Sequence, residues 1–170
     1  MSLPDLLERN LKIVFCGTAA GKTSDERQEY YAHIGNRFWH TLHMIGLTPR
    51  QLEPSQYGEL LKYGMGLTDL VKSVAGNDRE LSPDHFNCTG LRAKMEDYQP
   101  AIVAFTSKRA AKEFTGLKSV EYGHLLQRKG DTILFVLPSP SGNARRWWNE
   151  HYWQELANLY RSIGLHRSRF

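Results

Sequence analysis

The sequence predicts an α/β protein, a three-layer α/β/α sandwich with a central four-stranded parallel sheet. Apolar runs at residues 11–16, 101–106 and 133–137 are typical of strands that helices cover on both faces. A shorter run at residues 66–71 supplies the fourth strand. Helical patterns lie between these runs and after the last one, and such alternation favours a parallel sheet.

Helices are expected where apolar residues recur every three or four positions, because such residues share one face. These positions are Phe38, Leu42 and Ile45; Leu60 and Leu61; Leu91 and Met95; Ala110, Ala111 and Phe114; and Trp153, Leu156, Ala157, Tyr160 and Ile163. No linker rich in proline, glycine or serine divides the chain. Residues 1–170 are therefore expected to form a single domain, with a core from about residue 11 to residue 163.

The composition argues against several classes of protein. No apolar run approaches the ~18 residues of a membrane span, and the N-terminus lacks the apolar stretch of a secretory signal. Cys16 and Cys88 are the only cysteines, and neither has a neighbour at zinc-binding spacing. We expect an intracellular, cytoplasmic protein, nucleoid-associated in a bacterium, that needs no metal and no cofactor. The net charge of +4 is compatible with a polyanionic partner.

Polar residues follow three of the predicted strands. GTAAGKT at residues 17–23 follows the first strand, Asp69 ends the short one, and PSPSGNARR at residues 138–146 follows the last. Ligands of a parallel α/β sheet bind at the carboxyl ends of its strands, which meet at one edge. We therefore expect the functional site where these three segments converge.

The first of these loops is close to the phosphate-binding pattern GxxxxGK[ST]. Gly17 and Gly21 are separated by three residues rather than four, so the loop is too short to wrap a triphosphate in the usual way. A nucleotide triphosphatase is thus a disfavoured alternative. The small residues of the turn still allow its backbone to approach a phosphate or a base closely.

Five segments, in order along the chain from about residue 11 to residue 160, carry a family resemblance. They read IVFCGTAAG, YAHIGNRFWHTLHMIGLTPRQL, GMGLTDLVKS, DYQPAIVAFTSKRA and LPSPSGNARR. Together they resemble the uracil-DNA glycosylase superfamily, most of all its mismatch-specific uracil/thymine-DNA glycosylase branch. The resemblance implies a monomeric enzyme that flips a base out of double-stranded DNA containing uracil or a mismatch. It would hydrolyse the N-glycosidic bond in base excision repair.

The resemblance also suggests roles for residues of this chain. Tyr31 would stack on the flipped base, although its neighbour Tyr30 remains an alternative. The expected substrate-binding residues are Thr18, Ala19, Tyr31 and Ser139, and the expected DNA-binding residues are Lys22, Ser141, Gly142, Asn143, Arg145 and Arg146. Within the second set Asn143 would enter the vacated stack, whereas Ser141 and the two arginines would contact phosphates.

Departures from the family pattern in two motifs change the expected chemistry. In the first motif, Ala19 stands where the family has the asparagine that holds the attacking water. In the second motif, Ser139 stands where the bacterial branch has asparagine, and Asn143 stands where leucine is usual. We therefore expect Asp69 to act as the catalytic base, because a carboxylate can accept the proton of water. The alternative roles for Asp69 are to cap a turn or to pair with Lys72.

Several carboxylates besides Asp69 could supply the base that Ala19 cannot. Asp25, Glu26 and Glu29 follow the first motif and compete for this role, although they are also typical of a solvated helix face. His33 could orient the substrate or serve only the local structure. The alternative to a working glycosylase is a DNA-binding member of the family that has lost catalysis.

Overall fold

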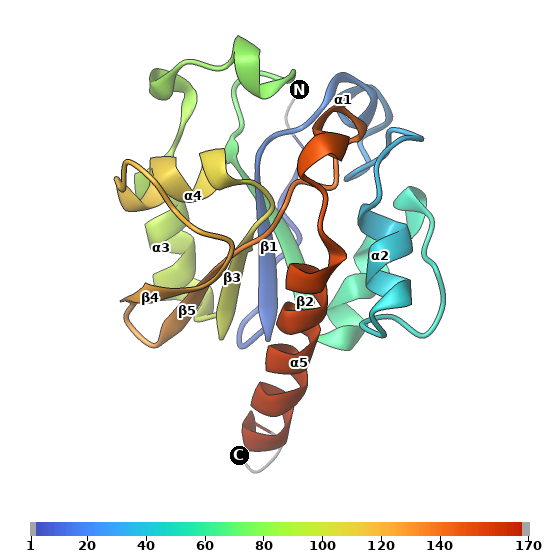
Figure 1. The fold of residues 1–170 in the computed structure, drawn as a ribbon, viewed down its shortest axis with the longest axis vertical. Coiled ribbons are helices and arrows are strands. Elements are labelled where there is room, and N and C mark those ends of the chain that lie inside the picture. Colours follow the sequence, from blue (N-terminus) through green and yellow to red (C-terminus); the bar gives the residue numbers. More distant parts are fainter. Residues whose placement is uncertain (1–2, 168–170) are drawn as a thin grey trace.

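A computed structural model describes residues 3–167, and it contains one five-stranded sheet (Figure 1). The strands are β1 (Ile13–Ala19), β2 (Met65–Val71), β3 (Ile102–Phe105), β4 (Gly123–Lys129) and β5 (Thr132–Val136), in the spatial order β2-β1-β3-β5-β4. The four expected strands are present and run parallel to one another. The α/β prediction is confirmed, but the sheet has a fifth strand, β4, which pairs antiparallel with β5.

The helices form two layers, one on each face of the sheet, as the sequence predicts. They are α1 (Lys22–Arg27), α2 (Phe38–Met44), α3 (Cys88–Tyr98), α4 (Lys108–Thr115) and α5 (Glu150–Arg167), with 3₁₀ helices η1 (Pro54–Tyr63), η2 (Asp78–Glu80), η3 (Pro83–His85) and η4 (Gly142–Trp147). The buried side chains of α2, η1 and α5 share one apolar core with the sheet. Those of α3 and α4 share the other. In Figure 1, α3 and α4 lie to the left and α2 to the right.

Side chains alternate between these two cores along each central strand, as they must in a pleated strand. Phe15 of β1 belongs to the core under α2 and α5, and its neighbour Cys16 to the core under α3 and α4. In β2, Leu67 belongs to the core under α2 and α5, and Leu70 to the core under α3 and α4. The last residues of these strands therefore point to a predictable side of the sheet.

The N-terminal segment lies along the outer edge of β2. Leu6 and Leu67 exchange two backbone hydrogen bonds of 2.9 Å as an antiparallel bridge. The carboxylate of Asp5 binds the ammonium groups of Lys72 at 2.7 Å and Lys94 at 2.6 Å. This segment ties the strand that carries Asp69 to α3. Within residues 3–167, no helix combines the length and the apolar character that crossing a membrane requires.

Candidate active site

Asp69 lies near the carboxyl end of β2, directly opposite Gly17 in the register of β1 and β2. Two residues earlier in β2, Leu67 faces the core under α2 and α5, so Asp69 faces the same side by alternation. The residue is only 8% exposed. The structure thus places a nearly buried carboxylate at the edge where the sequence predicts the site.

Three polar side chains converge on the position that a side chain at Gly17 would occupy. A Cβ atom at Gly17 would lie 2.7 Å from Oδ1 of Asp69 and 3.4 Å from the hydroxyl oxygen of Thr106. The same position is 3.6 Å from the hydroxyl oxygen of Tyr31. Glycine is needed here for space, because any side chain would displace the carboxylate. We name Asp69, Thr106 and Tyr31 the Gly17 cluster.

Burial raises the pKa of Asp69 to about 7, which is the largest effect on this carboxyl group. The positive charges of Lys72 and Lys94 and a backbone hydrogen bond from Gly17 act in the opposite direction, whereas Asp5 adds to the increase. The ammonium of Lys72 is itself held by Asp5 at 2.7 Å and by the carbonyl oxygen of Leu3 at 2.9 Å. The ammonium group of Lys72 is therefore paired with Asp5 and not directly with Asp69. With a pKa of about 7, the Asp69 carboxyl group gains or loses its proton near neutral pH.

Tyr31, rather than Tyr30, belongs to the Gly17 cluster. The Tyr31 hydroxyl shares a hydrogen bond of 3.2 Å with that of Thr106, and its ring stacks on Phe38 with centroids 4.0 Å apart. Tyr30 is a core residue whose hydroxyl donates to the carbonyl oxygen of Pro4. Burial raises the pKa of the Tyr31 hydroxyl, which therefore stays a neutral donor.

Thr106 belongs to the Gly17 cluster but was not predicted from the sequence. It directly follows β3, and its side chain is buried beside the other two groups of the cluster. The signal was present, because the rule that directs attention to strand ends applies to β3 as it does to β1, β2 and β5.

The first-motif loop is covered in part by the segment that follows β2. The hydroxyl of Thr18 donates a hydrogen bond of 2.6 Å to Oδ1 of Asp78, and the backbone N–H of Gly76 donates to the carbonyl oxygen of Ala20. Thr18 is buried, whereas Ala19 is half-buried at the end of β1. A contact between Thr18 and a base would therefore use its backbone, since its hydroxyl is already engaged.

The second-motif loop is ordered by a series of short-range hydrogen bonds. The hydroxyl of Ser139 accepts from the backbone of Ser141, and the hydroxyl of Ser141 accepts from the backbone of Asn143, both at 3.2 Å. The side chain of Asn143 in turn donates to that of Asn77 at 3.3 Å. The segment after β2 therefore contacts both motif loops and brings them together. Nothing in the sequence pattern around Asn77 and Asp78 predicts this role.

The three basic residues that are expected to bind DNA have exposed side chains. Lys22 is the first residue of α1, and Arg145 and Arg146 lie in η4; all three side chains face solvent. Figure 1 shows α1 and the orange turn of η4 together at the top, while α5 runs to the bottom of the view. The exposed cations thus lie at the same end of the molecule.

A third loop, residues 31–37, packs against the second-motif loop. The backbone N–H of Arg37 donates to the carbonyl oxygen of Pro140 at 2.9 Å. The ring nitrogen Nδ1 of His33 accepts from the backbone of Gly35 at 2.9 Å, which makes this histidine a turn-forming residue. Asn36 accepts from the backbone of Phe38 at the start of α2. The loop that carries Tyr31 is therefore built by its own polar side chains.

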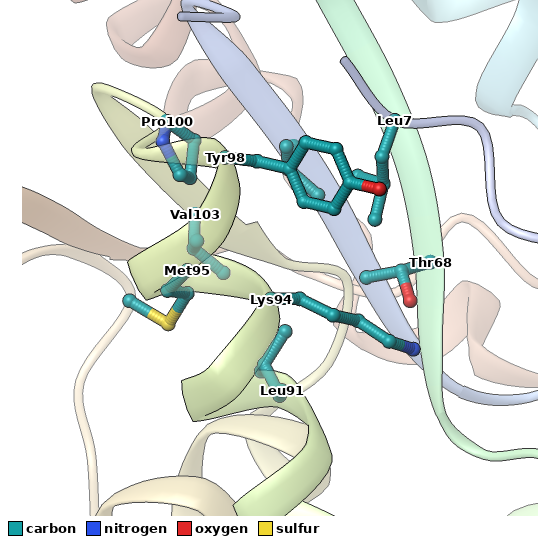
Figure 2. A pocket seen from close by; sticks show the side chains of 9 residues that line it. Leu7, Thr68, Leu91, Lys94, Met95, Tyr98, Pro100 and Val103 are labelled. Carbon is teal, nitrogen blue, oxygen red and sulfur yellow. The ribbon is translucent and has the colours of Figure 1, made fainter. Parts of the chain in front are cut away.

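Two cavities lie away from the Gly17 cluster. One is a crevice of about 10 Å³ between α3 and the sheet, where Figure 2 shows Lys94 extending toward Thr68 on the face opposite Asp69. The other, of about 410 Å³, is lined by Asn10, Pro100 and Thr132 among others, near the amino ends of the strands. The first is too small for a base, and the second is at the wrong edge for the predicted chemistry. Across the described part of the chain, no three His, Cys, Asp or Glu side chains form a group that could hold a metal ion.

Comparison with known proteins agrees with the resemblance seen in the motifs. The family model of the uracil DNA glycosylase superfamily matches residues 4–157. Among solved structures, the chain is similar to a protein from Methanosarcina acetivorans that is described as a candidate uracil DNA glycosylase. The two share 21% sequence identity over 96% of this chain and 97% of that one, with a TM-score of 0.68. At this identity, the similarity shows a shared fold.

Proposed function

Because the chain belongs to the uracil-DNA glycosylase superfamily, we propose that it removes uracil from double-stranded DNA with Asp69 as its catalytic base. Membership implies a DNA N-glycosylase, and the observation that carries the finer proposal is the Gly17 cluster. A buried carboxylate whose pKa is about 7 stands there beside two hydroxyl groups. Perturbed carboxyl groups of this kind are typical of catalytic sites.

The reaction requires a water molecule to attack C1′ of the deoxyribose as the bond to N1 of uracil breaks. The uracil leaves as an anion, and the attacking water must lose a proton. Ala19 offers no side-chain acceptor for that proton, whereas Asp69 in its ionised form does. A base with a pKa near the working pH combines a useful ionised fraction with a strong tendency to accept the proton.

The tyrosine of the cluster suits a flipped base. Phe38 supports one face of the Tyr31 ring, so the ring is held in a fixed plane on which a pyrimidine could stack. Base–aromatic stacking is worth about 1–3 kcal/mol and tolerates different bases. Backbone groups of Thr18 and Ala19 would read the edge of the base, which predicts selectivity looser than an asparagine side chain would give.

We assign the protein to the mismatch-specific branch of the superfamily. The assignment rests on the five sequence segments and their order along the chain. Mismatched uracil or thymine would be easier to extrude than a paired base, because less pairing energy opposes the flip. Lys22, Ser141, Arg145 and Arg146 would hold the phosphates on either side of the target, with Gly142 and Asn143 at the duplex.

Incubation with a duplex that contains a single uracil, followed by hot alkali, tests the proposed function. Base removal leaves an abasic site, and alkali then breaks the strand at that position. Strand breaks with the wild-type protein and their loss in Asp69→Asn would support the proposal. Glu29→Gln is the matched control, because Glu29 is a half-buried carboxylate just after α1 and outside the cluster.

A DNA-binding protein without catalysis is the second candidate, and Ala19 is the observation that favours it. The expected result for that candidate is tight binding to the uracil duplex with no strand breaks. The near match to a phosphate-binding loop carries no comparable weight, since the family match covers that loop.

A further inference from the structure

Ile34 is an apolar side chain that the fold leaves in solvent. It is 99% exposed and lies in the loop of residues 31–37, beside the predicted DNA-binding loops. A single exposed apolar side chain is common on protein surfaces, so the position of Ile34 beside these loops, and not its exposure alone, suggests a partner. Leu126 is also fully exposed, but it lies on β4 at the far edge of the sheet.

The turn that carries Ile34 is held on both sides. Before it, the ring of His33 accepts a hydrogen bond from Gly35, and the carbonyl oxygen of His33 accepts one from Asn36, both at 2.9 Å. After it, the backbone of Arg37 is fixed to Pro140. The apolar side chain therefore projects from an ordered turn, so little conformational entropy would be lost when it is buried.

Ile34 is also next to the loop that is expected to enter the duplex. A Cβ atom at Gly142 would lie 3.2 Å from the carbonyl oxygen of Gly35, so the two glycines are in close contact. Ile34 precedes one of these glycines and Asn143 follows the other. The two loops thus meet one residue away from Ile34 and one residue away from Asn143.

Asn143 alone is poorly suited to fill an emptied base stack. It is short and polar, and its amide already donates to Asn77. Proteins that open base steps commonly insert Phe, Leu, Ile, Met or Pro, because an apolar side chain replaces part of the lost stacking. The apolar side chain that position 143 lacks is therefore present on the neighbouring loop.

We propose that Ile34 inserts into the duplex beside the flipped nucleotide and serves as the apolar wedge of this protein. The inference rests on the proposed function, because a wedge is needed only where a base leaves the stack. Asn143 lies beside the wedge and contributes a polar contact. The partner of the exposed isoleucine is thus the interior of the DNA base stack.

The test compares Ile34→Ala with Ile34→Leu and with Leu126→Ala as the exposed-leucine control. Single-turnover cleavage is measured on uracil in duplex and in single-stranded DNA. A second readout is the fluorescence of 2-aminopurine placed next to 2′-fluoro-2′-deoxyuridine, a target that resists cleavage. The adenine analogue brightens when its neighbour leaves the stack, so it reports flipping without chemistry.

We expect Ile34→Ala to slow duplex cleavage by about tenfold and to reduce the fluorescence increase, with single-stranded cleavage unchanged. Ile34→Leu should stay within about twofold of wild type, because the volume and apolar character are kept. Leu126→Ala should match wild type in all assays. Equal rates for Ile34→Ala and wild type on the duplex, or an equal loss on single and double strands, would overturn the wedge. A wild-type protein that neither cleaves nor brightens the probe would instead refute the proposed function itself.

Discussion

The Gly17 cluster and the second-motif loop lie at the same end of the molecule but have opposite physical character. In the cluster, Asp69 and Thr106 are buried beside the half-buried Tyr31, and burial raises the pKa of the Asp69 carboxyl group to about 7. The loop exposes Arg145 and Arg146 to solvent, and its polar side chains bond mainly to their own backbone. Burial prepares a group for chemistry, whereas exposure leaves cations free to meet phosphates.

The largest expected effect comes from removing the carboxylate. Asp69→Asn keeps the shape of the side chain but abolishes the base, so single-turnover cleavage should fall by about 10²–10⁴-fold with little change in DNA affinity. Adding Ala19→Asn to that variant should restore part of the rate, because it rebuilds the water-holding amide of the family pattern. If Asp69→Asn cleaves normally and Glu29→Gln is crippled, the base lies after the first motif instead.

The pH dependence of cleavage tests whether the buried carboxylate of Asp69 is the base. Asp69 must be ionised to accept a proton, and its pKa is about 7. The single-turnover rate should therefore fall about tenfold for each pH unit below that value and level off above it. A rate that stays flat from pH 5 to pH 8 would show that a group with an ordinary carboxyl pKa, or no base at all, limits the reaction.

Ionisation of Asp69 should increase the cleavage rate but decrease the stability of the folded protein. Its pKa rises from 3.8 to about 7 on folding, so the folded protein holds a proton that the unfolded chain releases between these values. The contribution to stability is complete below pH 4 and is lost as the pH rises through 7. Asp69→Asn should therefore raise the free energy of unfolding at pH 8 by on the order of 2–4 kcal/mol, and by less at pH 4. Urea denaturation at both pH values measures the difference.

Removing one cation from the second-motif loop should have a smaller effect, which is on DNA binding. If Arg145 binds a phosphate, Arg145→Ala should weaken binding to all duplexes alike and lower the slope of log affinity against log salt by roughly one. The decisive measurement is a salt titration with uracil-containing and plain duplexes of the same length. An unchanged slope would place Arg145 away from the DNA.

No effect at all is expected from chelation. The cluster offers one carboxylate and two hydroxyls, and the described residues form no metal-binding group. Cleavage in EDTA should equal cleavage in buffer. Activity that disappears in EDTA and returns with zinc or magnesium would require a metal role that the cluster does not suggest.

The sequence predicted the buried parts of the fold better than its edge. The strands that became β1, β2, β3 and β5 are apolar because helices cover both of their faces, and each lies close to its expected position. β4 was missed because its sequence, GHLLQRK, has no buried pattern. It pairs with one neighbour only, and most of its side chains are exposed.

Local sequence predicts which segments reach the candidate site, but not the contacts between them. Asp69 lies opposite Gly17 because the ends of parallel strands meet at one edge of the sheet. Tyr31 reaches the same place from the loop after α1, which strand periodicity does not predict. The hydrogen bonds of Thr18 to Asp78 and of Asn143 to Asn77 join segments about sixty residues apart, and their spacing carries no periodic signal. Only the folded chain reveals that the segment after β2 ties the two motif loops together.

The bridge between Leu6 and Leu67 should limit the self-association of this protein at high concentration. An unpaired outer strand offers its backbone to any similar strand, which is a common start of aggregation. The bridge occupies part of the free edge of β2, and β4 at the other edge is irregular between His124 and Arg128 and ends on Lys129. A chain shortened beyond Leu6 would expose the backbone of β2, and we expect such a chain to self-associate before it loses its fold.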